Sequence, residues 1–269
     1  MIKRIKRSFL EVTASLLIIG FIWFIVSYCF GLFNPVTVNK YVLTDGNKTV
    51  VFQEMRHIGF GAFYKKVNED VDHYRSQNYI LGYEGIFDIG NKEMYLGEKI
   101  NYDNKYIEQP ISIGGFQKTD VNLDLNWFEI MDKIEKKLSV QNKEHSEKDS
   151  YKKETIADIP LLKNQLEMAS DGLDPLTYTA ENIYRIRYFE NLNNKYGIDV
   201  ASIVHGSHAI EDSVIMDERN KIVADFIKES PNKNILIHYG AEHFKGILSL
   251  LKNSDSKWKI VSIEKTDVL

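Results

Sequence analysis

An uninterrupted apolar run from Val12 to Phe33 follows a short basic tip at the start of the chain. As an α-helix this run is about 33 Å long, at about 1.5 Å per residue. The hydrocarbon core of a bilayer is about 30 Å thick, so the run is long enough to cross it. A buried core helix is the alternative, but such a helix rarely has apolar residues on every face for six turns. The sequence therefore predicts one transmembrane helix.

The charges around this run predict its orientation. Four cations (Lys3, Arg4, Lys6 and Arg7) precede the run and none lies within it, which places the N-terminus in the cytoplasm. A cleavable signal peptide would have a shorter apolar region that ends at small residues. Here bulky Tyr28 precedes Cys29, which also argues against processing and lipidation at that cysteine. We predict an uncleaved anchor over residues 1–33 and an extracytoplasmic domain over residues 34–269.

Cysteine and charge content narrow the classes of protein that the outer domain can belong to. Cys29 is the only cysteine, so the domain has neither a disulfide nor a cysteine-ligated metal. The chain has 34 basic and 38 acidic residues, and four of the basic ones lie in the N-terminal tip. The outer domain is therefore acidic, which argues against nucleic acid as a partner.

Apolar patterns in the outer domain predict an α/β fold. Tyr41–Thr44 and Thr49–Phe52 flank an Asp-Gly turn, which favours a β-hairpin. Asn126 and Glu129 resemble a capping box at the start of a helix. Towards the C-terminus, expected strands alternate with expected helices; the strands are 200–204, 235–239 and 259–263. This alternation predicts a mixed, mainly parallel sheet that is covered by helices on both faces.

Three polar residues lie just after expected strands. His57 follows Thr49–Phe52, Glu84 follows Tyr79–Tyr83, and His243 follows Ile235–Tyr239. In open α/β sheets, ligands bind at the carboxyl ends of the strands. Two imidazoles and a carboxylate could hold a divalent metal that lowers the pKa of a bound water. A turn residue or helix cap at each position is the alternative.

The segments around these residues resemble a known family. They read Glu54-Met-Arg-His57, Gly82-Tyr-Glu84-Gly85, Asp217-Glu-Arg219-Asn220 and Gly240-Ala-Glu-His243, with Asn122-Leu-Asp124 between the second and the third. Their order resembles that of the TraB/PrgY/GumN/Tiki family, which has two Gly-x-x-His motifs separated by a glutamate and an Arg-Asn or Arg-Asp pair. The resemblance runs with gaps from about Val50 to the C-terminus.

This resemblance implies a metal-dependent peptidase, or a membrane protein that inactivates a peptide, with a fold similar to that of erythromycin-esterase-like and ChaN-like proteins. It implies that His57, Glu84 and His243 bind a divalent metal such as Mn, Co or Zn, and that Arg219 is the family's arginine. Glu84 would be a ligand or the general base. Asn122 and Asp124 would line the substrate cleft, and Gly240 and Asn220 complete the motifs.

The chain departs from the family pattern in two ways. Glu54 stands where the first motif has glycine, and we expect its carboxylate to point into the metal pocket. The anchor lies at the N-terminus, without C-terminal membrane segments. Two other functions stay open: a metal-independent, esterase-like hydrolase with a histidine base, and a non-catalytic module that binds a peptide or haem.

Overall fold

The computed structural model describes residues 2–85, 102–103, 106–109, 115, 117–145, 180–196, 210 and 213–269. These residues belong to two compact units. The first unit contains helix α1 (Ile2–Phe33) and helix α5 (Ala180–Tyr196), and the second contains the β-sheet and its helices. Helix α5 thus falls in the unit of α1, whereas the predicted outer domain, residues 34–269, includes its residues.

Helix α1 has the length and the apolar composition that a membrane crossing requires, over Val12–Gly31. Nearly all of its described side chains in that stretch are exposed. Among the described residues, no other helix meets the same criteria.

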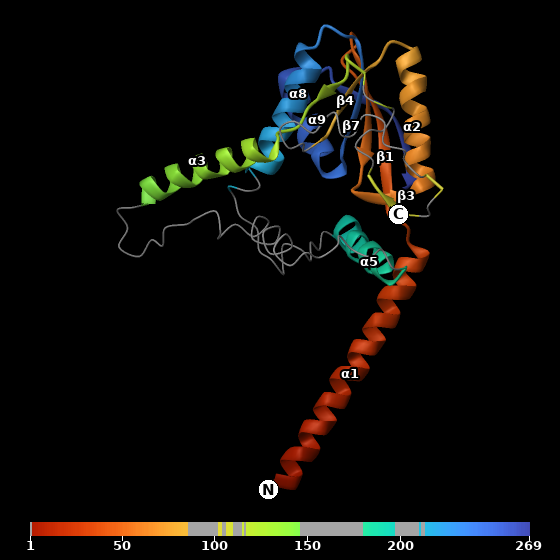
Figure 1. Cartoon of the computed structure of the whole chain (residues 1–269), viewed down its shortest axis with the longest axis vertical. Coiled ribbons are helices and arrows are strands. Elements are labelled where there is room, and N and C mark those ends of the chain that lie inside the picture. Colours follow the sequence, from red (N-terminus) through yellow and green to blue (C-terminus); the bar gives the residue numbers. More distant parts are fainter. Residues whose placement is uncertain are drawn as a thin grey trace. The chain divides into compact units, whose positions relative to one another are not determined.

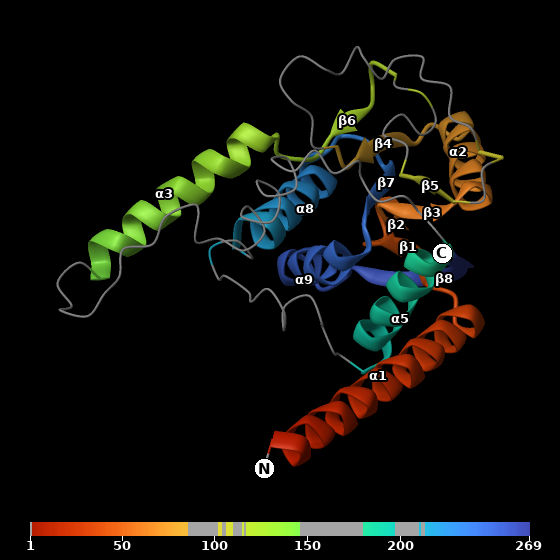
Figure 2. The ribbon, with the colours of Figure 1, turned by 60° about the horizontal axis from the view of Figure 1, so that its bottom comes forward.

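A six-stranded mixed sheet forms the centre of the second unit, in the order β6-β4-β7-β2-β1-β8 (Figures 1 and 2). Its strands are β1 (Thr37–Thr44), β2 (Thr49–Met55), β4 (Ile80–Tyr83), β6 (Val121–Asn122), β7 (Asn234–Gly240) and β8 (Lys259–Asp267). Neighbours from β6 to β2 are parallel, whereas β1 is antiparallel to both β2 and β8. A mixed, mainly parallel sheet was therefore predicted correctly.

Among the described residues, a short second sheet and several helices also belong to this unit. Strands β3 (Ile58–Phe60) and β5 (Tyr106–Glu108) pair antiparallel. The helices are α2 (Gly61–Ser76), α3 (Trp127–His145), the π-helix η3 (Ser213–Glu218), α8 (Arg219–Glu229), the 3-10 turn η4 (Ala241–His243) and α9 (Phe244–Ser254). The expected strand 200–204 lies outside the described residues.

The predicted hairpin and capping box are both present. Asp45 Oδ1 accepts hydrogen bonds from the backbone amides of Asn47 and Lys48, and Gly46 has a φ of 95°, which glycine adopts without strain. At the start of α3, the backbone N of Asn126 donates to Glu129 Oε2 at 2.8 Å, and that of Glu129 donates to Asn126 Oδ1 at 2.9 Å. The local sequence was therefore enough to predict both the hairpin turn and the capping box.

The main core lies between the sheet and helices α8 and α9. Alternate residues of β7 (Ile235, Ile237 and Tyr239) join this core, because side chains along a strand point to opposite faces. Leu236 and His238 therefore point to the other face, and both are buried. Figures 1 and 2 both draw α2 on the side of the sheet away from α8 and α9.

Among the described strands, β8 lies at one edge of the sheet and is antiparallel to its neighbour, β1. The sequence predicted a strand at Lys259–Ile263, and the structure extends it to Asp267. Because β1 is antiparallel to both β2 and β8, β8 runs in the same direction as β2, and its carboxyl end lies at the edge of the sheet where β2, β4 and β7 finish.

Candidate functional site

The carboxyl ends of β2, β4 and β7 meet at one edge of the sheet, because these three strands are parallel neighbours. His57 follows β2, Glu84 follows β4, and His243 closes the 3-10 turn that follows β7. The backbone N of Glu84 donates to the carbonyl of His238 at 2.9 Å, so the β4–β7 ladder positions the glutamate. The structure therefore places the three residues at the edge that the sequence predicted.

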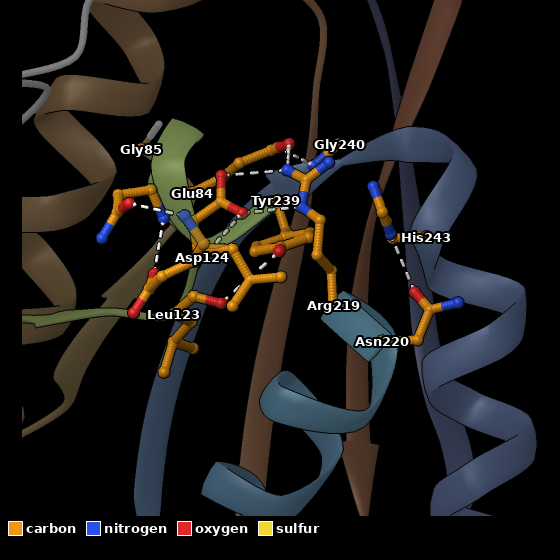
Figure 3. A network of polar contacts seen from close by, with 12 residues as sticks. Glu84, Gly85, Leu123, Asp124, Arg219, Asn220, Tyr239, Gly240 and His243 are labelled. Atoms are coloured by element: carbon orange, nitrogen blue, oxygen red, sulfur yellow. Dashed lines mark hydrogen bonds and ion pairs between the residues drawn. The ribbon is translucent and has the colours of Figure 1, made fainter. Parts of the chain in front are cut away.

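A buried arginine organises this edge (Figure 3). Arg219 begins α8, and its Nε and Nη2 donate to the two oxygens of Asp124 at 2.6 and 2.9 Å. Its Nη2 also donates to Glu84 Oε1. Glu84 Oε2 accepts the backbone N–H of Gly240 at 2.6 Å. The side chains of Arg219, Asp124 and Glu84 are 5%, 0% and 12% exposed, so the ion pairs are almost fully removed from water.

His243 is held in one orientation beside this network. Its Nδ1 lies 2.8 Å from Asn220 Oδ1, and the amide oxygen can only accept, so Nδ1 carries the proton and Nε2 is left as the basic nitrogen. Gly246 on α9 permits this contact, because a Cβ at that position would collide with the Asn220 amide. The side chains of both His243 and Asn220 are buried.

Gly240 keeps the space between Glu84 and His243 open. A Cβ at this glycine would lie 3.1 Å from Glu84 Oε2 and 3.3 Å from His243 Cδ2. Such contacts are tighter than most that real Cβ atoms make, so with a larger residue the carboxylate and the imidazole would have to shift by a few tenths of an ångström. The glycine of the second Gly-x-x-His motif thus has a steric reason in this chain.

Burial sets the charge states of the site. The pKa of His243 is lowered to about 4, and burial is the main cause. Arg219 and, to a smaller extent, His57 contribute to this lowering, whereas Glu84 raises the pKa. Burial raises the pKa of Asp124 to about 6 although Arg219 opposes the shift. Burial also disfavours the charged form of Arg219, but Asp124, Tyr239 and Glu84 outweigh it and raise the pKa of the guanidinium above its ordinary value. At neutral pH, we therefore expect a neutral His243 beside a charged Arg219 and an ionised Asp124.

The predicted three-ligand metal set is only partly assembled. His57 is exposed, and it lies near enough to His243 to affect that residue's pKa. Glu84 has one oxygen on Arg219 and the other on Gly240. Across the part of the chain that the structure describes, no three His, Cys, Asp or Glu side chains are grouped closely enough to hold a metal. Because both of its oxygens are engaged, Glu84 in this arrangement does not fit as the third ligand.

Glu54 and Asp124 have surroundings that differ from those expected. Glu54 Oε2 accepts hydrogen bonds from the backbone N and the Nδ2 of Asn39 at 2.7 and 2.9 Å, so its carboxylate ties β2 to β1 and does not point freely into the site. Asp124 has a fully buried side chain that both pairs with Arg219 and caps the backbone N of Leu125 at 2.8 Å. We therefore assign Asp124 to positioning Arg219 and not to contacting a substrate.

Asn122 connects the two loops that carry the acidic residues. Its Nδ2 donates to the carbonyl of Gly85 at 2.9 Å, and its Oδ1 accepts from the backbone N of Asp124 at 3.1 Å. The residue is exposed at the end of β6, so it both orders these loops and remains accessible to a ligand.

No protein-family model, curated protein or solved structure matches this chain. The resemblance in the motifs therefore rests on the residues and their order.

Sequence reasoning missed Tyr239. Its ring centroid lies 5.5 Å from Arg219 Cζ and 4.9 Å from the His243 ring, so it packs against both. Its hydroxyl donates to the carbonyl of Leu123 at 3.5 Å. The position next to Gly240 at the end of an apolar strand was visible in the sequence, but nothing there showed which face of the sheet the ring would occupy.

Two buried histidines make the stability of the domain depend on pH. Burial, with a smaller contribution from Arg75, lowers the pKa of His238 to about 3. Its Nε2 has no hydrogen-bond partner among the described residues. Unfolded histidine has a pKa of about 6.5. Below that pH, His238 and His243 bind protons in the unfolded chain but not in the folded one. The free energy of unfolding is therefore fully present above pH 6.5 and is lost as the pH falls towards 4 and 3.

We predict that His238→Leu reduces the slope of the free energy of unfolding against pH by about 1.4 kcal/mol per pH unit below about pH 6.5. The measurement is urea unfolding of the wild-type and variant chains between about pH 4 and pH 7. Comparing the two chains removes the contribution of the carboxylates, which titrate in both. Parallel curves for the two chains would show that His238 does not have the lowered pKa.

Proposed function

We propose that this chain is a membrane-anchored hydrolase that acts outside the cytoplasm on a peptide or a small carbonyl compound, with the assistance of a divalent metal. The observation that supports it is the juxtaposition of a neutral His243, fixed through Asn220, with the buried Glu84–Arg219–Asp124 network at the edge where parallel strands end. Ligand sites of open α/β sheets lie at this edge. The proposal extends to the finer architecture, in which α2 covers the sheet face opposite α8 and α9.

The chain's own groups have distinct roles in this proposal. His57 and His243 would hold the metal, which when bound supplies a water of lowered pKa. The low pKa of His243 suits a ligand, because ligation needs the neutral imidazole, and its Nδ1 contact with Asn220 resembles the outer contacts of metal-bound histidines. Arg219 fixes Glu84 through its Nη2, and its positive charge favours negative charge that develops on a substrate oxygen.

A second candidate is a metal-independent, esterase-like hydrolase. It is favoured by Glu84, both of whose oxygens are engaged by Arg219 and Gly240 and not directed to a metal. In this case His243 Nε2 accepts the proton of the attacking water. A base with a pKa of about 4 is a weak proton acceptor, so this site would hydrolyse activated esters more readily than amides.

Activity in the presence of a chelator separates the two candidates. The purified full-length chain is screened for hydrolysis of a peptide library and of activated esters, with and without EDTA, and its metal content is measured. We expect peptide cleavage that EDTA abolishes and that Mn, Co or Zn restores, with metal lost in His57→Gln. Ester hydrolysis that persists in EDTA would support the second candidate, and binding without any turnover would refute both.

The orientation of the chain belongs to the same proposal. The four N-terminal cations and the apolar stretch Val12–Gly31 support a cytoplasmic N-terminus. Protease added to intact cells should therefore remove the outer domain and leave a short membrane-bound stub. Complete protection of the domain would place it in the cytoplasm and contradict this orientation.

A further inference from the structure

Helix α5 packs on the last three turns of α1. Ser27 and Gly31 of α1 are buried, whereas Val26, Tyr28 and Cys29 in the same stretch are exposed. They are four residues apart and therefore on one helical face, and small residues at this spacing let a second helix approach closely. The first unit is thus a helix pair built on a small-residue face.

Polar side chains of α5 bind the end of α1. The last carbonyls of a helix have no partner within it. Arg187 Nη1 donates to the carbonyl of Gly31 at 3.2 Å, and Asn191 Nδ2 donates to that of Asn34 at 2.9 Å. Lys195 Nζ donates to Asn34 Oδ1 at 2.8 Å. Cations at this position also complement the negative end of the α1 dipole.

Aromatic rings of both helices also meet in the contact between α1 and α5. Tyr188 makes edge-to-face contacts with Trp23 and Phe30, at centroid distances of 6.0 and 5.7 Å, and Phe189 lies 6.4 Å from Trp23. Lys195 Nζ lies 5.4 Å from the Phe30 ring centroid. Trp and Tyr rings with nearby cations are typical of the boundary between a bilayer and water.

The depth of these contacts follows from the length of the anchor. If Val12–Gly31 crosses the hydrocarbon core, Gly31 lies at its outer boundary, and Trp23 lies about 12 Å deeper. Helix α5 contacts α1 from Trp23 to Asn34, so it adjoins the outer leaflet. It is too polar to cross the core itself, because its sequence contains Glu181, Arg185, Arg187, Glu190 and Lys195.

We infer that α5 is an interfacial helix whose partner is the lipid surface, seated among the headgroups of the outer leaflet and held there by α1. Its rings reach towards the acyl chains while its polar groups bind the end of the anchor and face the headgroups. This inference rests on the membrane crossing of α1 that the proposed function includes, and it is independent of the proposed hydrolysis.

Depth-dependent fluorescence quenching tests the inference. In a Cys29→Ser background, Tyr196→Cys is labelled with bimane; Tyr196 ends α5 and is 63% exposed. The full chain is reconstituted in phosphatidylcholine–phosphatidylglycerol vesicles that carry a doxyl group either near the headgroup or near the end of the acyl chain. We expect strong quenching by the shallow doxyl group and weak quenching by the deep one. A label at Ile18→Cys, on α1, should show the reverse.

Two further variants connect the quenching to the helix contact. Ser27→Leu adds bulk to the buried face and should release α5, so that quenching of the Tyr196 label falls to its level without doxyl lipid. Ser15→Leu makes the same change in an exposed part of α1 and should leave the quenching intact.

Each other outcome overturns a defined part of the inference. Quenching at Ile18 without quenching at Tyr196 would refute the interfacial helix and leave the anchor intact. Absence of quenching at both would refute the anchor as well. Quenching at Tyr196 that survives Ser27→Leu would show that α1 does not hold α5 at the surface.

Discussion

Replacing Arg219 with methionine should lower the free energy of unfolding by about 3–5 kcal/mol, the range for breaking a buried ion pair from one side. Arg219 is the only described cation that hydrogen-bonds to either Asp124 or Glu84. Without it, two carboxylates remain in a site whose side chains are at most 12% exposed. Urea unfolding of the purified chain measures the loss.

Two variants control this prediction. Lys221→Met removes a cation from the same helix, but the Lys221–Asp225 pair is solvent-exposed, so we expect no measurable change. Arg219→Met combined with Asp124→Asn removes one uncompensated charge and should recover part of the lost stability. The contradicting outcome is a loss of unfolding free energy in the double variant that equals the sum of the losses in the two single variants. That result would show that the two side chains are not coupled and that the network does not act as a unit.

Replacing His243 with glutamine should reduce hydrolysis by about 100- to 10,000-fold, which is the usual contribution of a positioned proton-transfer group. Glutamine keeps a polar side chain of similar reach, but it can neither ligate a metal as imidazole does nor accept a proton. The rate is measured with the substrate that the hydrolysis screen identifies, and urea unfolding verifies that the variant still folds.

His73→Gln is the matched control, because His73 is exposed on α2 and its Nε2 contacts the side chain of Gln77, four residues later on that helix. We expect its rate to equal that of the wild-type chain. Full activity in His243→Gln would refute the assignment of this histidine in both candidate mechanisms.

Residues close in the sequence determined much of the local structure. The turn at Asp45-Gly46, the capping box of Asn126 and Glu129, and the apolar stretch of α1 all form as their sequences indicate. Each depends on backbone geometry and on side chains only a few residues apart, so the local sequence is enough to predict it. The order of strands and helices likewise predicted the mainly parallel sheet.

The candidate site could be predicted in outline, because parallel strands bring their carboxyl ends to one edge. This placed His57, Glu84 and His243 together without any knowledge of side-chain direction. It could not place the Glu54 carboxylate, which Asn39 on the neighbouring strand holds. It also could not reveal the ring of Tyr239 beside Arg219. The first contact depends on the register between β1 and β2, and the second depends on how α8 packs on the sheet. No pattern within one strand specifies either.

The sequence by itself determined the apolar helix, the hairpin, the class of fold and the edge of the sheet where chemistry is expected, because periodicity and local hydrogen bonding act along the chain. Only the tertiary structure decided the partners of the polar groups. It assigned Glu84 to Arg219 and Gly240, Asp124 to Arg219, and α5 to the end of α1. The physical reason is that a buried polar atom must find its partner wherever folding brings one, and those partners lie 95 to 156 residues away in the chain.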